Sequence, residues 1–154
     1  MSQINAETIC QIAIVVKDIE QTAQNYAEIF GVKTPEIFLV PPPEETHILY
    51  RGKPTATRAK LCVFKMGAIV LELTEPDEEP SSWKEFLEQK GEGVHHIGFV
   101  VNDREATLDF LNQRGIPVRH TGVYPGGSYT FVDSEAQLGV LLNLKYSENK
   151  GGDD

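Results

Sequence analysis

The sequence is poor in cysteine and in basic residues. Its 154 residues include two cysteines, and 14 Lys and Arg stand against 23 Asp and Glu, which gives a formal net charge of −9. A strongly acidic chain is a poor partner for nucleic acids or anionic membranes, because both carry negative charge themselves. We therefore expect no nucleic-acid site and no membrane-binding surface.

Long apolar runs and processing signals are also missing. No stretch approaches the roughly 20 apolar residues that a membrane-spanning helix needs, and the polar start lacks the pattern of a signal peptide. Cys10 and Cys62 both lie in apolar, strand-like stretches, which is typical of reduced core cysteines. These absences favour a cytoplasmic protein.

What the chain does contain is an internal repeat, most visible around residues 93–103 (GVHHIGFVVND). This stretch has the pattern of a buried strand that leads into a helix start, and residues 9–18 (ICQIAIVVKD) repeat it. The matching positions are Gln11 and His96, residues 12–16 and 97–101, and Asp18 and Asp103. The repeat predicts two copies of one module.

Each copy has the periodicity of a β-α-β-β-β unit. The expected elements of the first are a strand at 9–16, a helix from the N-cap Asp18 to Gly31, and strands at 36–40, 58–65 and 68–74. Those of the second are a strand at 94–101, a helix at 103–113, and strands at 117–120, 128–132 and 138–144. Between them, a helix is expected at 81–90. The irregular segment 41–57 is either a functional loop or a mobile surface loop.

The predicted fold is α+β, with two paired β-α-β-β-β modules in one domain over residues 1–154. Residues 9–74 form the first module, 75–93 a linker and helix, 94–145 the second module, and 146–154 a disordered tail; residues 1–8 are a loose lead-in. Each module makes a half-curled sheet with its helix on the convex face. Pairing the two gives an open, cup-like sheet around one cavity.

Five stretches carry a resemblance to the vicinal-oxygen-chelate (glyoxalase/bleomycin-resistance/dioxygenase) superfamily. They are residues 11–18 (QIAIVVKD), 26–31 (YAEIFG), 71–76 (LELTEP), 93–99 (GVHHIGF) and 138–144 (LGVLLNL). Within the superfamily the chain is most similar to the methylmalonyl-CoA epimerases. The resemblance implies the paired-module fold, a homodimer, and a substrate that is a small carboxylate, an acyl-CoA thioester or an oxo compound.

The resemblance also implies a metal site. The family pattern places four ligands on the inward face of the sheet, and the corresponding residues here are Gln11, Glu72, His96 and Asn143. Glu72 and His96 match the pattern, whereas Gln11 replaces a histidine and Asn143 a glutamate. Amides bind transition metals far more weakly than imidazole or carboxylate. We therefore expect a weakly held divalent ion such as Co, Ni, Zn or Mn.

Glu72 and Lys60 are the candidate catalytic residues. Glu72 lies within an apolar strand, where a charge is costly to bury, so a place in the cavity is favoured over an exposed outer face. Lys60 lies near the family's second base; it could accept a proton, hold an anionic substrate or form a salt bridge. Because the amide of Asn143 cannot transfer protons, the sequence does not support two-base epimerisation.

The remaining polar candidates have plainer alternatives. His96 is expected to face the cavity, although a hydrogen-bonded core histidine would give the same pattern. His95 is expected on the opposite face, since neighbouring side chains of a strand alternate. It has a supporting role there, and with Asn143 it is a candidate for substrate binding. Gln11 and Asn143 could equally be ordinary polar positions.

Two classes of function follow. The first is an epimerase, isomerase or lyase that acts through an enolate-like intermediate. The second is a non-catalytic binding protein of the same fold, like the drug-sequestering resistance proteins, which needs the cavity but no metal. The pairing of Glu72 with His96 favours the enzyme. His47 and His120 match no family position, and we expect both at the surface.

Overall fold

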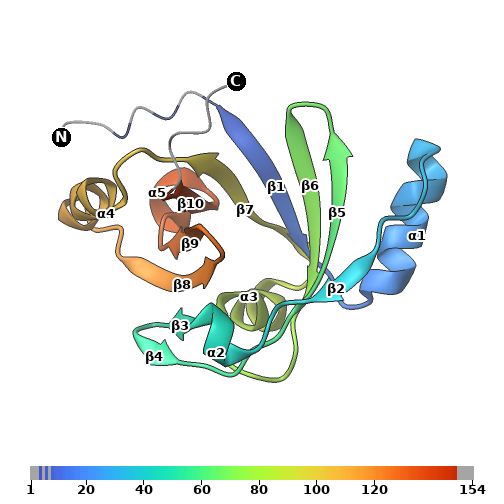
Figure 1. The fold of residues 1–154 in the computed structure, drawn as a ribbon, viewed down its shortest axis with the longest axis horizontal. Helices are drawn as coiled ribbons and strands as arrows, with labels where there is room; N and C mark the ends of the chain where they lie inside the picture. The colour runs from blue at the N-terminus through green and yellow to red at the C-terminus, as the bar shows by residue number, and fades with distance from the viewer. Residues whose placement is uncertain (1–3, 5, 7, 149–154) are drawn as a thin grey trace.

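The structure, a computed structural model, describes residues 4, 6 and 8–148. The other residues of the expected lead-in and tail lie outside this part of the chain. The elements are β1 (Ile9–Val15), α1 (Ile19–Phe30), β2 (Ile37–Leu39), α2 (Pro43–Thr46), β3 (Leu49–Tyr50), β4 (Lys53–Pro54), β5 (Lys60–Met66), β6 (Ile69–Glu75), α3 (Ser82–Lys90), β7 (Gly93–Val100), α4 (Arg104–Gln113), β8 (Val118–Tyr124), β9 (Gly127–Val132), α5 (Glu135–Leu138) and β10 (Leu141–Ser147). The strands form one open sheet, so the predicted α+β class is confirmed (Figure 1).

The first module consists of β1, α1, β2, β5 and β6, with the strand order β2-β5-β6-β1. Asp18 caps α1 by accepting a hydrogen bond from the backbone N–H of Gln21. Gly31 ends the helix with φ 69°, a left-handed conformation that costs glycine little. Helix α1 lies against β5 and β6, where Ile19 and Phe64 belong to one buried cluster (Figure 1).

The second module repeats this plan with β7, α4, β8, β9 and β10, in the strand order β7-β10-β9-β8. Asp103 caps α4 by accepting from the N–H of Ala106, as Asp18 does for α1. Leu111 of α4 is buried in one cluster with Phe99 and Leu144 of the sheet. Each module therefore buries its helix on the outer side of its own strands, and the inner sides are left to face each other.

The modules join where β1 pairs antiparallel with β7 at the middle of the sheet. Inside each module the first and last strands run parallel with the same register. Gln11 lies two residues before Ala13, which pairs with Glu72, and His96 lies two residues before Gly98, which pairs with Asn143. This register confirms that Gln11 and His96 occupy equivalent places.

The segment 41–57 contains short elements and bridges the two modules. It leaves the first module after β2, forms α2, β3 and β4, and pairs β3 with β8 of the second module. The hydroxyl of Tyr50 donates to Glu85 of α3 at 2.7 Å, and Arg51 forms an ion pair with the same carboxylate at 2.7 Å. The segment and α3 together lie along one end of the cup (Figure 1).

The end of the second module differs from the prediction. Residues 135–138 form α5, and β10 starts at Leu141 rather than at residue 138. Ser134 explains this, because its hydroxyl donates to the carbonyl of Val140 and accepts from the N–H of Leu142, which holds a tight turn. Strand β10 continues to Ser147, so the tail expected from residue 146 starts too early. Among the described residues, no helix combines the length and apolarity that crossing a membrane requires.

Candidate functional site

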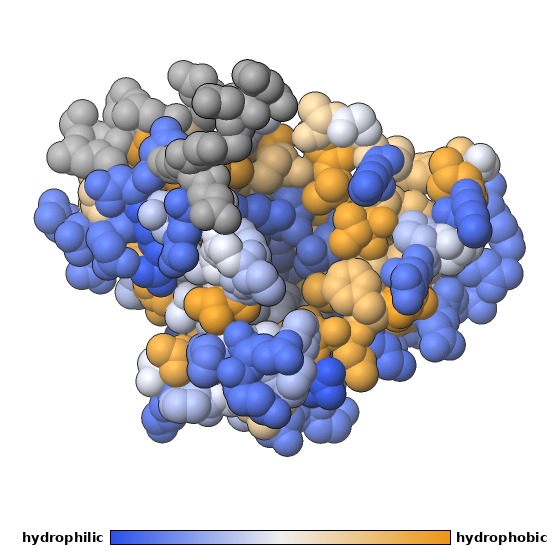
Figure 2. Space-filling view, viewed as in Figure 1, coloured by the Kyte–Doolittle hydropathy of each residue, from blue (hydrophilic) through white to orange (hydrophobic). Residues whose placement is uncertain are grey.

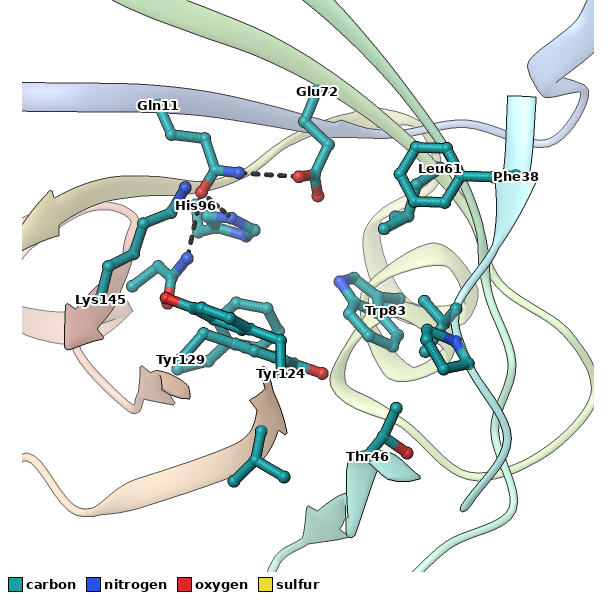
Figure 3. A pocket seen from close by; sticks show the side chains of 15 residues that line it. Gln11, Phe38, Thr46, Leu61, Glu72, Trp83, His96, Tyr124, Tyr129 and Lys145 are labelled. Carbon is teal, nitrogen blue, oxygen red and sulfur yellow. Dashed lines mark hydrogen bonds between the residues drawn. The ribbon is translucent and has the colours of Figure 1, made fainter. Parts of the chain in front are cut away.

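A cavity of about 330 Å³ opens inside the cup. Its apolar wall includes Phe38, Val40, Leu61, Trp83, Tyr129 and Phe131, and its polar group comprises Gln11, Glu72, His96, Asn143 and Lys145. Figure 2 shows the hollow at the middle of this face, with apolar residues gathered on the side of β2, β5 and β6. The polar group lies together on the central strands, while Trp83 approaches from α3 (Figure 3).

The four residues at the family's ligand positions converge through the Gln11 side chain. Its amide nitrogen donates to Glu72 Oε2 at 2.7 Å. Its carbonyl oxygen accepts from Asn143 Nδ2 at 3.0 Å and lies 3.0 Å from His96 Nε2, which donates to it. Gln11, His96 and Asn143 are all buried. The four side chains therefore converge as expected, and they form hydrogen bonds with one another.

Glu72 is the carboxylate of the cavity. It accepts hydrogen bonds from Gln11 and, at 3.2 Å, from the hydroxyl of Thr74. Burial raises the pKa of the Glu72 carboxyl, and the positive charge of Lys145 and these two hydrogen bonds oppose the rise. The result is a carboxylate held in one orientation and made a stronger base by its apolar surroundings.

The prediction that His95 and His96 point to opposite faces is wrong. The pairing of β1 with β7 shifts register between Ala13 and Ile14, so His95 is the extra residue of a β-bulge. The two rings lie on one side, with 2.7 Å between their Nδ1 atoms, and both contact Phe131. A bulge cannot be recognised from the alternating pattern of the sequence.

The histidines form a directional chain of hydrogen bonds. Because His96 Nε2 donates to Gln11, its Nδ1 accepts from His95 Nδ1, and His95 Nε2 accepts from the hydroxyl of Ser82 at 2.9 Å. Burial lowers the pKa of His96 to about 3 and that of His95 well below its ordinary value. Both imidazoles are therefore neutral at pH 7, and Glu72 is the only acidic side chain among the described residues that line the cavity.

The structure separates Lys60 from this group. Leu61 lines the cavity, and Lys60 precedes it on β5 with an ion pair to Glu75 at 3.4 Å and a side chain 44% exposed. Since strand neighbours alternate, Lys60 points away from the cavity. Of the two candidate catalytic residues, Glu72 alone belongs to the group of polar side chains described above.

The sequence prediction gives no site role to Lys145 or Trp83, although both line the cavity. Alternation offered a signal for Lys145, because it follows Asn143 by two residues and so shares its face. Trp83 comes from the linker helix, whose position relative to the sheet no pattern predicts. His120 is also misplaced by the sequence: it is 0% exposed and contacts Trp83, Tyr129 and Phe131. His47 is exposed, as expected.

A family model described as the Glyoxalase/Bleomycin resistance protein/Dioxygenase superfamily matches residues 10–132. The chain belongs to this superfamily. The uncharacterized protein YqjC of Bacillus subtilis (strain 168) is 30% identical to this chain over 90 residues. That match spans 56% of this chain and 64% of YqjC, which is less than two thirds of the relative.

Solved structures of methylmalonyl-CoA epimerases are similar to this superfamily member. One, in complex with methylmalonyl-CoA and NH4+, is 26% identical with a TM-score of 0.63, and the match covers 94% of this chain and 97% of that one. A variant of the Streptomyces coelicolor enzyme in complex with 2-nitronate-propionyl-CoA gives the same values. The Mycobacterium tuberculosis enzyme, 20% identical with a TM-score of 0.58 over 96% of this chain and 92% of its own, shares the fold.

The side chains at the superfamily's metal positions do not fit a divalent ion. His96 Nε2 donates a proton to Gln11, so it has no lone pair to offer, and the Gln11 oxygen already accepts two hydrogen bonds. Lys145 adds a positive charge to the same wall. Among the described residues, no group of three or more His, Cys, Asp or Glu could hold a metal. The donor set is thus one carboxylate beside two amides and a protonated ring nitrogen.

Two buried polar atoms of the cavity residues remain without a partner among the described residues. They are Trp83 Nε1, a donor, and Asn143 Oδ1, an acceptor, and both residues are 3% exposed. A buried polar atom without a hydrogen bond costs about 1–3 kcal/mol. A ligand that supplies an oxygen to Trp83 and a donor to Asn143 would recover this cost.

Proposed function

We propose that this protein is an isomerase-type enzyme that moves a proton on a small carbon acid, with Glu72 as the base. The substrate bears a carboxylate, an acyl thioester or an oxo group next to the acidic carbon. The orientation and surroundings of Glu72 carry the proposal, since burial raises its pKa while Gln11 and Thr74 hold it in place.

The reaction needs one base and donors for the developing oxyanion. Glu72 takes the proton from carbon, the electron pair moves to the adjacent oxygen, and Glu72 returns the proton at a second position. Trp83 Nε1 is one donor for that oxygen. Because Lys60 is paired with Glu75 outside the cavity, one-base transfer within a single substrate is favoured over a two-base inversion.

The similar structures support this choice of substrate. Their ligands are methylmalonyl-CoA and 2-nitronate-propionyl-CoA, both acyl-CoA derivatives. A cavity of about 330 Å³ suits an acyl group of that size or a free oxo acid.

We also keep the homodimer, the cytoplasmic location and the single domain over residues 1–154 as predictions.

A second candidate is a binding protein without catalysis. The observation that favours it is the closed hydrogen-bond chain from Ser82 through both histidines to Gln11, which is stable without any reacting partner. The aromatic wall of Trp83 and Phe131 would hold a flat apolar ligand in the same cavity.

Solvent exchange distinguishes the two candidates. Methylmalonyl-CoA and a panel of small oxo acids are incubated with the protein in D2O, and NMR follows loss of the acidic C–H signal. We expect catalysed exchange that Glu72→Gln lowers by about 10²–10⁴-fold. Glu75→Gln, which removes the carboxylate paired with Lys60, is the matched control and should keep the rate. Full exchange by Glu72→Gln would contradict the role of Glu72. Saturable quenching of the single tryptophan without any exchange would favour the binding protein.

A further inference from the structure

Lys145 brings a positive charge to the wall of the cavity. It lies on β10 two residues after Asn143, so both side chains leave the strand on the same face, whereas Leu144 between them is buried in the core under α4. Figure 3 shows the Lys145 side chain reaching toward Gln11 and His96. Lys145 is the one Lys or Arg among the described residues that line this cavity.

Among the described residues, no carboxylate forms an ion pair with this ammonium. Lys60, Lys84 and Lys90 each form an ion pair within 4 Å. Among the described residues Lys145 forms none, as is also true of four other lysines, but it is the one of these that lines the cavity. The positive charge of Lys145 acts on the Glu72 carboxyl, but the hydrogen bonds of Glu72 are with Gln11 and Thr74. A partly buried cation that no described carboxylate pairs with is available to an anionic ligand in the cavity. The site is therefore arranged to receive a negative oxygen.

The internal repeat shows that the second module alone has a cation at this position. In the parallel registers, Val15 pairs with Thr74 and Val100 pairs with Lys145, so Thr74 and Lys145 are equivalent positions. The same strand carries Asn143 where the family pattern has a glutamate. The second module has thus exchanged an expected carboxylate for an amide and has placed an ammonium beside it.

We infer that the Lys145 ammonium is the resident cation of this cavity, where it binds the oxyanion of a compact monoanionic ligand in place of a divalent metal ion. For turnover, this inference rests on the proposed function: Glu72 takes the proton, the electron pair moves to oxygen, and Lys145 keeps all its protons while its charge stabilises that oxygen. For binding, it rests on the charge and position of Lys145 alone.

Ligand charge provides the first test. Trp83 is the single tryptophan and lines the cavity, so its fluorescence reports binding of benzoate and of its neutral isostere benzamide. We expect the wild type to bind benzoate about tenfold or more tightly than benzamide, because a hydrogen bond to a charged group is worth that much. Lys145→Met should lose this preference and keep benzamide affinity, and Lys145→Arg should retain it.

Equal losses of benzoate and benzamide affinity in Lys145→Met would overturn the inference, as would a wild type that does not prefer benzoate. The melting temperature of each variant verifies folding. Glu72→Gln removes the proposed base but keeps Lys145, so its preference for benzoate should persist or grow. Turnover of Glu72→Gln in the exchange assay therefore tests the role of Glu72, and the preference for benzoate tests the role of Lys145. The two proposals can fail separately.

Metal binding provides the second test, and it needs no substrate. The variant Gln11→His with Asn143→Glu restores the family's donor types, and visible absorption of Co²⁺ measures its affinity. Adding Lys145→Met should raise that affinity by about tenfold or more, because a fixed positive charge nearby repels a dication. If Lys145→Met leaves the Co²⁺ affinity of this variant unchanged, the Lys145 ammonium does not lie near the metal position, and the inference is overturned.

Discussion

Equivalent positions at and beside the cavity share a backbone register in the two modules but carry different side chains. The pairs, first module then second, are Gln11 and His96, Glu72 and Asn143, and Thr74 and Lys145. The first module contributes the negative charge and the second the positive one. The repeat therefore determines which positions converge at the cavity. The residues that differ between the modules determine the chemistry of the site.

The backbone departs from the repeat as well. Strand β7 has a bulge at His95, and the position equivalent to Ala13 is Gly98. All three buried histidines, His95, His96 and His120, belong to the second module. Acid and added bulk should therefore act mainly on the second module, and the variants below use the first as the internal reference.

Acid should produce the largest effect. Burial lowers the pKa of His96 and of His120 to about 3, and that of His95 also falls. The unfolded chain binds protons at these rings below about pH 6.5 while the folded chain does not, so stability is complete above that pH and is lost as pH falls toward 3. The His96 and His120 rings each cost about 3 kcal/mol of stability at pH 4. Glu72 opposes this in part, because its raised pKa makes its burial less costly as pH falls.

Urea unfolding between pH 6.5 and 4 measures the slope of stability against pH. His120→Gln should reduce that slope by about 1.4 kcal/mol per pH unit, the value for one proton. His47→Asn removes an exposed imidazole from a residue with φ 46°, a conformation that asparagine tolerates, and is the matched surface control. An unchanged slope in His120→Gln would mean that this ring is protonated in the folded protein.

Added bulk at Gly98 should have a smaller effect. A Cβ there would lie 2.7 Å from Gln11 Oε1 and 3.0 Å from Gln11 Cβ, so Gln11 must shift and lose hydrogen bonds. We expect Gly98→Ala to lower the free energy of unfolding by about 1–3 kcal/mol. The same substitution in a Gln11→Ser background should cost less, because serine lacks the Oε1 atom that makes the shortest contact.

The equivalent position serves as the control. Ala13→Gly removes a buried methyl group and should cost about 1 kcal/mol whichever residue is at position 11. Urea unfolding of the wild type, Gly98→Ala, Gln11→Ser and the double variant gives the coupling energy between positions 11 and 98. A cost of Gly98→Ala that is the same in both backgrounds would show that Gln11 moves freely.

The sequence predicted the repeating part of the molecule well. Both modules, the alignment of Gln11 with His96, and the helix starts at Asp18 and Asp103 follow from local pattern, and the structure confirms them. These features depend on residues close in the chain, where periodicity and capping chemistry act directly.

The parts that the sequence did not predict depend on contacts between distant segments. The bulge at His95 is set by pairing with β1, and the buried place of His120 is set by Trp83, which arrives from the linker helix. The hydrogen bonds of Gln11 also need four strands in their final places. A pattern of alternating residues contains no information on any of these three.

The helix caps should give the smallest and most equal effects. Asp18 has φ −132° and ψ 94°, Asp103 has φ −133° and ψ 98°, and each accepts one backbone hydrogen bond of 3.0 Å. Asp18→Ala and Asp103→Ala should each lower the free energy of unfolding by about 1 kcal/mol, because the N–H loses its acceptor. Asparagine keeps that acceptor and loses only the interaction of the charge with the helix dipole, so Asp→Asn at either position should cost about 0.3–1 kcal/mol at most. Thermal and urea unfolding of the four variants would check the equality. Costs that differ between the modules by more than about 1 kcal/mol would mean that one helix is held by more than its cap and its core, and that the asymmetry of the cavity extends to the outer layer.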